Sequence, residues 1–198
     1  MSKSQPEKTA VIFKTESLSY KQLYQKALAI GTQLRNMGIQ AGDRVCFSAV
    51  SKPEMIAVYL GIHVCKAVAV FLDKNATPKH MKEIYQTAGA KLLLTDKPMK
   101  EAGQNCTVFS LRQLYAEAGD SSIPGLLDED RQEEDLAEIL FTTGTTGKPK
   151  GVMLSYKAVY HILMNTIKGC GYSSETVDRK STRLNSSHRL TSRMPSSA

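Results

Sequence analysis

The chain has 198 residues, a formal net charge of +7 and 41% hydrophobic residues. Residues 1–8 are polar and lack the apolar stretch of a signal peptide, and the most apolar stretch, 55–72, is interrupted by His63 and Lys66. Secretion and membrane insertion are therefore disfavoured, and the composition is that expected of a soluble cytoplasmic protein.

The beginning of the sequence predicts a short hairpin followed by a helix. The two strands of the hairpin are expected at 10–13 and 16–19. Ser19 and Gln22 have the spacing of a capping box, so a helix is expected to begin at Ser19 and to end at Gly38. The residues expected on its inward face recur at helical spacing: Leu23, Ala27, Ile30, Leu34 and Met37.

Strands then alternate with helices. A strand at 44–49 precedes a helix that Ser51 and Glu54 open by the same capping pattern, with Pro53 between them, and a strand follows at 67–72. The next predicted elements are a helix from 77 to 88 that Gly89 ends, strands at 91–95 and 107–110, and a helix at 111–118. The first of these helices is expected to bury Met81, Ile84, Tyr85 and Ala88. This alternation predicts an α/β fold with a largely parallel sheet and helices on both faces.

Residues 120–135 form one long irregular region with acidic runs at 128–130 and 133–135. We interpret them as an exposed loop, because adjacent carboxylates on a loop are usually solvated, with an acidic metal site as the alternative. Apolar runs follow at 139–141 and 152–154, the second of which is read as a strand. Ser155 is expected to cap a last helix that runs to about Lys168.

A loop rich in glycine, threonine and lysine lies between these two apolar runs. Glycines permit positive φ and let backbone N–H groups approach an anion, threonine hydroxyls add donors, and lysines add charge. The residues expected to bind phosphate are Thr142, Thr143, Gly144, Thr145, Thr146, Gly147, Lys148 and Lys150. The loop differs from that of P-loop NTPases, because Pro149 follows Lys148 where Ser or Thr is needed. The alternative is an ordinary polar hairpin turn, but the chemistry of such a turn does not require two lysines and four threonines.

Residues 141–155 resemble the signature loop of the adenylate-forming superfamily, which holds acyl-CoA synthetases, aryl-CoA ligases, luciferases and the adenylation domains of peptide synthetases. Three upstream segments are similar to further family blocks: 18–23, 38–45 and 61–73. The chain departs from the usual family residues at four positions, with Val68 for Gly, Phe71 for Pro, Tyr156 for His and Ala158 for Asn. The resemblance covers about residues 9–177 and implies the N-terminal part of the large domain of such an enzyme.

The resemblance implies an ATP-dependent acid–thiol ligase, with an acyl-CoA synthetase as the main interpretation. Such an enzyme binds MgATP and a carboxylic acid, here a fatty or aryl acid, forms an acyl adenylate with release of pyrophosphate, and transfers the acyl group to CoA. The loop and Lys150 would hold the β- and γ-phosphates. Two alternatives remain: an adenylation domain that loads a carrier-protein thiol, and a short non-catalytic nucleotide-binding protein.

No catalytic residue is assigned, because the later family motifs for adenine, magnesium and ribose and the catalytic lysine do not occur in the chain. We therefore expect residues 1–177 to be part of an AMP-binding large domain that is inactive alone. A large sheet cut partway leaves an unpaired edge and exposed core, so this fragment is also expected to fold poorly.

Residues 178–198 have a different character. Back-translation of 178–188 yields codons that read as a common sequencing-library adapter, and 192–198 continue it after three residues that a sample index would occupy. We interpret this segment as a non-native, disordered tail, with a genuine basic tail as the alternative. Without its five basic residues and one acidic residue, 21 basic and 18 acidic residues remain, a net charge of +3. This removes the main support for a nucleic-acid partner.

The remaining reactive side chains are assigned to structure. The wide spacing of the cysteines disfavours a disulfide framework or zinc site and predicts buried thiols. His63 and His161 lie in apolar helical stretches and are interpreted as core or boundary histidines. Asp73 follows a strand at its carboxyl end, where ligand sites of α/β proteins gather, but a turn residue is the simpler interpretation. The cysteines are Cys46, Cys65, Cys106 and Cys170.

Overall fold

The structure of the chain is a computed structural model that describes residues 5–48, 52–99, 106–119, 132–142, 149–173 and 176. The chain divides into two compact units, residues 1–160 and 161–198. All strands and the first turn of the last helix belong to the first unit. The acidic run at 128–130 and the tail at 178–198 lie outside the described residues, so the interpretations placed on them stay predictions.

The N-terminal hairpin and the first helix form as expected. Strand β1 (Thr9–Phe13) pairs antiparallel with β2 (Glu16–Ser19), and helix α1 spans Tyr20–Asn36. The Ser19 hydroxyl accepts from the Gln22 N–H at 3.2 Å, and the Gln22 side chain accepts from the Ser19 N–H at 2.8 Å, which confirms the capping box. Four of the five predicted inward residues are buried, but Met37 is 39% exposed because it follows the last helical turn as the C-cap.

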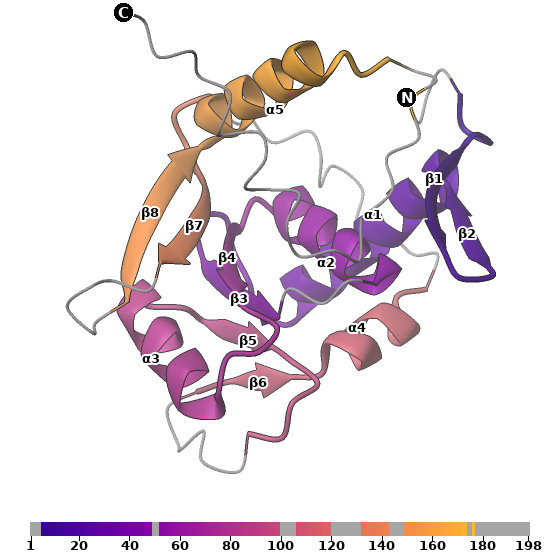
Figure 1. Cartoon of the computed structure of the whole chain (residues 1–198). Coiled ribbons are helices and arrows are strands. Elements are labelled where there is room, and N and C mark those ends of the chain that lie inside the picture. Colours follow the sequence, from indigo (N-terminus) through magenta and orange to yellow (C-terminus); the bar gives the residue numbers. More distant parts are fainter. Residues whose placement is uncertain are drawn as a thin grey trace, which may run out of the picture. The chain divides into compact units, whose positions relative to one another are not determined.

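The remaining elements alternate as predicted (Figure 1). They are β3 (Arg44–Ser48), α2 (Pro53–Val64), β4 (Val68–Leu72), α3 (Pro78–Ala88), β5 (Leu92–Leu94), β6 (Val108–Phe109), α4 (Leu111–Glu117), β7 (Leu136–Thr142), β8 (Lys150–Ser155) and α5 (Tyr156–Cys170).

Six strands form one sheet in the order β6-β5-β3-β4-β7-β8. Every neighbouring pair is parallel except β7 and β8, which are antiparallel. The expected α/β fold with a largely parallel sheet is confirmed. Parallel pairing places the carboxyl ends of β3, β4, β5 and β7 at the same edge of the sheet.

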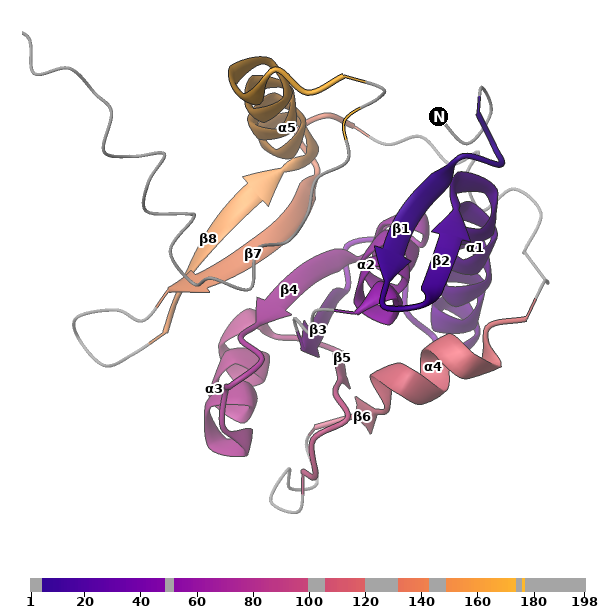
Figure 2. The same cartoon turned by 45° about the vertical axis from the view of Figure 1, so that its right-hand side comes forward.

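Helices cover both faces of this sheet, as predicted (Figure 2). Successive side chains of a strand point to opposite faces. Phe47 of β3 therefore packs in one core with residues of α1, α2 and α4, and its neighbour Cys46 packs in a second core with residues of α3. The first core also includes partly buried side chains of the N-terminal hairpin.

The N-cap position of helix α2 lies one residue later than predicted. Its N-cap is Lys52, which makes no side-chain capping bond, and Pro53 opens the helix. Ser51, which was expected to cap this helix, lies outside the described residues, so its capping role stays a prediction. A proline in the first turn is common, because its fixed φ suits the helix and the N–H that it lacks would have no partner within the helix.

The other predicted helix ends are confirmed. The Thr77 hydroxyl accepts from the His80 N–H at 3.3 Å at the start of α3, and Gly89 ends this helix in the left-handed conformation with φ of 58°. Met81, Ile84 and Tyr85 are buried as expected, and Ala88 is partly buried. At the start of α5 the Ser155 hydroxyl accepts from the Ala158 N–H at 3.3 Å.

Two glycines let α1 and α2 pack closely. A Cβ added to Gly31 would lie 2.6 Å from Cγ1 of Val64, and a Cβ added to Gly61 would overlap Ile30. Neither helix could keep its present position with a larger residue at either place, since real Cβ contacts are not this short.

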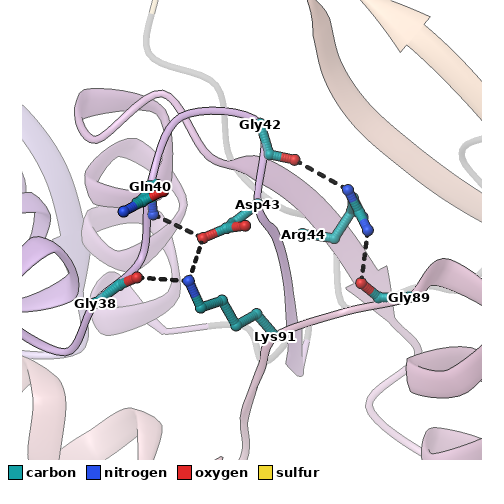
Figure 3. A network of polar contacts seen from close by, with 7 residues as sticks. All are labelled: Gly38, Gln40, Gly42, Asp43, Arg44, Gly89 and Lys91. Atoms are coloured by element: carbon teal, nitrogen blue, oxygen red, sulfur yellow. Dashed lines mark hydrogen bonds and ion pairs between the residues drawn. The ribbon is translucent and has the colours of Figure 1, made fainter.

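A polar network ties the elements together at the amino edge of the sheet (Figure 3). The Lys91 ammonium, next to β5, donates to Oδ2 of Asp43 at 2.8 Å and to the Gly38 carbonyl at 2.7 Å. The Arg44 guanidinium donates to the carbonyls of Ala88 at 3.0 Å and Gly89 at 2.8 Å, at the end of α3. A cation at this end of a helix satisfies carbonyls that have no partner within the helix.

The cysteines and isolated polar residues match the predictions in part. Cys46 and Cys65 are buried, but Cys106 is half-buried and Cys170 is exposed, and none of these four described cysteines forms a disulfide. The expectation of buried thiols is therefore wrong for Cys170. Asp73 Oδ1 accepts from the Asn75 N–H at 2.6 Å, which confirms the turn interpretation. His161 is exposed, contrary to the core or boundary position expected of it.

Among the described residues, no helix is both long and apolar enough to cross a membrane.

Candidate nucleotide-binding site

The predicted phosphate-binding loop connects the two strands of the β7–β8 hairpin. Thr142 and Lys150, the two ends of the loop, are paired residues in the antiparallel register, and Phe141 pairs with Gly151 next to them. Both ends are exposed. Residues 143–148 lie outside the described residues, so the phosphate-binding role of Thr143, Gly144, Thr145, Thr146, Gly147 and Lys148 stays a prediction.

The hairpin places the loop at the carboxyl edge of the sheet. Strand β7 pairs in parallel with β4, with Ala69 opposite Glu138 and Phe71 opposite Leu140, so both strands end at the same edge. Ligands of open α/β sheets bind outside this edge. The flanking apolar runs do form a hairpin, as the ordinary-turn alternative requires, but a hairpin connection can also hold phosphate, so the topology is compatible with both interpretations.

Gly151 has a packing role at the base of the loop. A Cβ at this position would lie 2.8 Å from Cγ2 of Ile139 and 3.1 Å from Cζ of Phe141, two side chains of the facing strand. Any other residue would push β8 away from β7 and change the separation of the loop ends.

A partly buried polar cluster lies at the other end of the hairpin. We call it the hairpin-base cluster; it consists of Tyr59, His63, Glu138 and Tyr156. The Tyr59 hydroxyl donates to Oε1 of Glu138, and Nε2 of His63 lies 3.7 Å from the same oxygen. Nδ1 of His63 lies 3.0 Å from the Tyr156 hydroxyl. Glu138 is only 7% exposed.

The pKa values in the hairpin-base cluster reflect these contacts. Burial acts to raise the pKa of the Glu138 carboxyl, but the His63 imidazole and the Tyr59 hydroxyl outweigh burial and hold it below its usual value. Burial, together with its bond to the Glu138 carboxylate, raises the pKa of the Tyr59 hydroxyl. Glu138 is therefore an ionised acceptor and Tyr59 a neutral donor.

The hairpin-base cluster was not predicted from the sequence. His63 is nearly buried, with a side chain 13% exposed, as expected, but it does contact a carboxylate, which its sequence neighbourhood did not suggest. Two signals could have indicated the cluster. Glu138 is a charged residue inside an apolar strand, and Tyr59 and His63 are one helical turn apart on α2.

Other polar groups near the carboxyl edge have structural partners. The Ser48 hydroxyl donates to Thr95 at 3.0 Å between the ends of β3 and β5. Asp96 accepts from the Ser110 hydroxyl at 2.7 Å and from the Arg112 N–H at 3.0 Å, and so fixes the start of α4. No group of three His, Cys, Asp or Glu side chains suited to a metal ion occurs among the residues that the structure describes.

The fold defines an α/β protein with an open, largely parallel sheet, and the loop is predicted to bind a nucleotide at the edge of this sheet. The model of the AMP-binding enzyme family matches residues 2–192. The chain belongs to this family. The matched range includes most of the segment interpreted as a tail, and the origin of that segment stays a prediction.

Curated relatives are large synthetases. The chain is 29% identical over 161 residues to bacitracin synthase 1 of Bacillus licheniformis, with 79% of this chain and 3% of that protein covered. It is 32% identical over 158 residues to malformin synthetase mlfA of Aspergillus vadensis, with 78% and 3% covered. The chain thus spans only a small part of the length of these relatives.

Solved structures share the fold. The N-terminal subdomain of NpsA of Klebsiella oxytoca has 28% identity and a TM-score of 0.72, with 79% of this chain and 39% of that chain covered. The o-succinylbenzoate coenzyme A synthetase MenE of Bacillus subtilis has 22% identity and a TM-score of 0.76, with 87% and 45% covered. The fold of this chain is that of the N-terminal subdomain of adenylate-forming enzymes.

Proposed function

We propose that this chain is the N-terminal part of an adenylation domain that activates a carboxylic acid as an acyl adenylate and transfers the acyl group to a carrier-protein thiol. The observation that carries the proposal is the Thr142–Lys150 pair, which holds both ends of the predicted phosphate loop at the ligand-binding edge of the sheet. Family membership supports the adenylation half of the reaction.

The relatives support a carrier protein as the acceptor better than CoA, the acceptor first expected from the sequence. Bacitracin synthase 1 and surfactin synthase subunit 1 are both similar to this chain, at 29% and 28% identity. NpsA has been solved with 3-hydroxybenzoyl-AMSN and as a fused adenylation–PCP di-domain. The proposed substrate is therefore an aryl or amino acid, and the proposed partner is a carrier protein.

The proposed reaction has two steps. A carboxylate oxygen of the acid attacks the α-phosphorus of ATP, the bond from this phosphorus to the bridging oxygen breaks, and pyrophosphate leaves with the bonding electrons. The thiol sulfur then attacks the acyl carbon, AMP leaves, and the thiol proton is released to solvent.

The loop is proposed to act in the first step, formation of the acyl adenylate. Its N–H groups, its hydroxyls and Lys150 are proposed to hold the β- and γ-phosphates, where negative charge grows as pyrophosphate departs. Mg²⁺ enters such a reaction with ATP and neutralises phosphate charge. Because the described residues hold no suitable cluster of ligands, we assign no residue and no step to the metal.

A direct test uses the complete reading frame that contains this chain, amplified from source DNA with a primer in the codons for 141–150 and sequenced past position 177. The expressed protein is assayed for ATP–pyrophosphate exchange with panels of aryl, amino and fatty acids. It is then offered CoA and a carrier protein with its thiol arm. Exchange followed by acylation of the carrier protein supports the proposal. Absence of exchange with every acid would reject it.

CoA as the acceptor remains a second candidate, because the fold is also that of a coenzyme A synthetase. At 22% identity this likeness concerns the fold alone. Exchange followed by formation of acyl-CoA, with the carrier protein left unmodified, would favour this candidate over the carrier-protein proposal.

A further inference from the structure

We propose that the hairpin-base cluster positions the phosphate loop, with Glu138 as its central positioning residue. The inference rests on the proposed function, since it assigns these side chains a role in ATP binding. None of them is placed against the nucleotide. They act through the two strands that carry the loop.

Helix α2 supplies one side of the cluster. Tyr59 and His63 are one turn apart, so both side chains leave the same face of the helix. Both side chains approach Oε1 of Glu138, the Tyr59 hydroxyl as a donor and Nε2 of His63 at 3.7 Å. The Tyr59 ring also contacts Phe71 of β4, with centroids 5.5 Å apart, which limits its movement. These contacts connect strand β7 to helix α2, which packs in the first of the two cores.

The cluster reaches both strands of the hairpin. Glu138 lies in β7, four residues before Thr142, and pairs with Leu154 of β8. Tyr156 follows β8 directly, and its backbone N–H donates to the carbonyl of Asp135 at 3.0 Å. His63 lies between Glu138 and the Tyr156 hydroxyl. One helix thus contacts the side chains at the base of both strands, and the loop lies at the opposite end.

The donors and acceptors in the cluster are mutually compatible. A His63 that carries a proton on Nε2 places it near the Glu138 carboxylate, at 3.7 Å and beyond hydrogen-bond distance, and leaves Nδ1 to accept from the Tyr156 hydroxyl. Tyr59 donates to the same carboxylate. Without Glu138 the Tyr59 hydroxyl would lose its acceptor, and without the Tyr59 hydroxyl the buried carboxylate would lose its donor. In both cases β7 would have to shift or open to solvate the remaining polar group.

Such a shift of β7 would displace Thr142, the end of the loop that this strand carries. Strands transmit displacement along their length, because their backbones are hydrogen-bonded to neighbours throughout. Misplacement of a reacting group by about 1 Å can lower a rate by about 10²-fold. The cluster is therefore expected to affect binding of the ATP phosphates and not binding of the acid.

The test compares Glu138→Leu, Glu138→Gln and Tyr59→Phe in the product of the complete reading frame. The control is Lys91→Met, which breaks a polar contact at the opposite edge of the sheet. For each folded protein, the Kd of ATP is measured by calorimetry, and KM values for ATP and for the acid are measured by pyrophosphate exchange. Leucine removes every acceptor, whereas glutamine keeps one for the Tyr59 hydroxyl.

We expect Glu138→Leu to raise the Kd and KM of ATP about 10-fold with the KM of the acid unchanged. Glu138→Gln should recover part of this loss. Lys91→Met should lower the melting temperature and leave ATP binding unchanged. If Glu138→Leu fails to fold, the Kd and KM of ATP for Tyr59→Phe decide instead. Both values are expected to rise about threefold, because one hydroxyl is lost.

The inference is overturned if the folded variants bind ATP as the wild type does, or if Lys91→Met weakens binding equally. A wild-type protein that binds ATP but exchanges no pyrophosphate would reject the proposed function, and the ATP Kd of the variants would still decide the role of the cluster. A wild-type protein that binds no ATP would overturn both.

Discussion

Thr142 and Lys150 lie opposite each other in the β7–β8 hairpin, so the two ends of the glycine-rich loop are held one strand spacing apart. Strands in a sheet are separated by about 4.8 Å. Any phosphate site at this loop therefore lies between two strand ends at this separation, next to the exposed Lys150.

Replacement of Lys150 by alanine is expected to slow ATP–pyrophosphate exchange. The ammonium is proposed to stabilise charge on the leaving pyrophosphate, and loss of one such stabilising group costs about 10²–10³-fold in rate. The control is Lys157→Ala, since Lys157 is paired with Glu134 at 2.8 Å outside the proposed site. Unchanged exchange in Lys150→Ala would remove Lys150 from the phosphate site.

Replacement of Gly31 by alanine is expected to lower the melting temperature. The added methyl group would meet the Val64 side chain at 2.6 Å, and overpacking of this kind costs about 1–3 kcal/mol. Gly169→Ala is the matched control, because this helical glycine has no atom within 4 Å of an added Cβ. Alanine there should leave stability unchanged or raise it by up to about 1 kcal/mol. Equal melting temperatures for the two variants would contradict the close packing of α1 and α2.

The Asp43–Lys91 pair is expected to make stability depend on pH. Burial acts to raise the pKa of the Asp43 carboxyl, but Lys91, the Gln40 N–H and Arg44 outweigh it and hold this pKa below its ordinary value of 3.8. Because the pKa is lower in the folded state, the stabilisation is fully present above pH 3.8 and disappears as the pH falls through the folded value.

Asp43→Asn should therefore lower the free energy of unfolding at pH 7 by roughly 0.5–1 kcal/mol, a value limited by partial exposure of the pair. The difference from wild type should vanish at acid pH. Denaturant titrations at several pH values measure this. Glu7→Gln, which alters an exposed pair with Lys21 at 3.5 Å, serves as the control and should change stability little. A difference that is the same at every pH would show that the Asp43 charge contributes nothing.

Thiol reactivity should follow burial. Cys170 is exposed and should react rapidly with a water-soluble disulfide reagent, and half-buried Cys106 should react more slowly. Burial raises the pKa of the Cys46 thiol, so this side chain is both covered and protonated. Mass spectrometry of the labelled native protein should find Cys46 and Cys65 unmodified until denaturant is added. Rapid labelling of either would indicate an open core.

Most elements were predictable because their signals are local. Ser19, Thr77 and Ser155 accept the expected capping bonds from residues three positions later, and Gly89 ends α3. Where a local signal was misread, the structure shows why. Met37 lies past the last turn of α1 as its C-cap, and the N-cap position of α2 is Lys52.

Of the candidate site, only the loop could be predicted from the sequence. Glycine, threonine and lysine in one short segment are informative by composition, and the resemblance to adenylate-forming enzymes agrees with the family that the chain belongs to. The acceptor thiol was not predictable, because the segments that resemble the family lie in the part that is expected to bind ATP. The first interpretation, CoA, is less well supported by the synthetase relatives than the carrier-protein alternative.

By itself the sequence determined the order of strands and helices and the family, and it predicts the phosphate loop, because caps, apolar periods and glycine-rich motifs act over a few residues. Only the tertiary structure decided that α2 brings Tyr59 and His63 to Glu138. Tyr59 and Glu138 are 79 positions apart in the chain. They meet because β7 inserts next to β4, and a single sequence carries no local signal for which strands become neighbours.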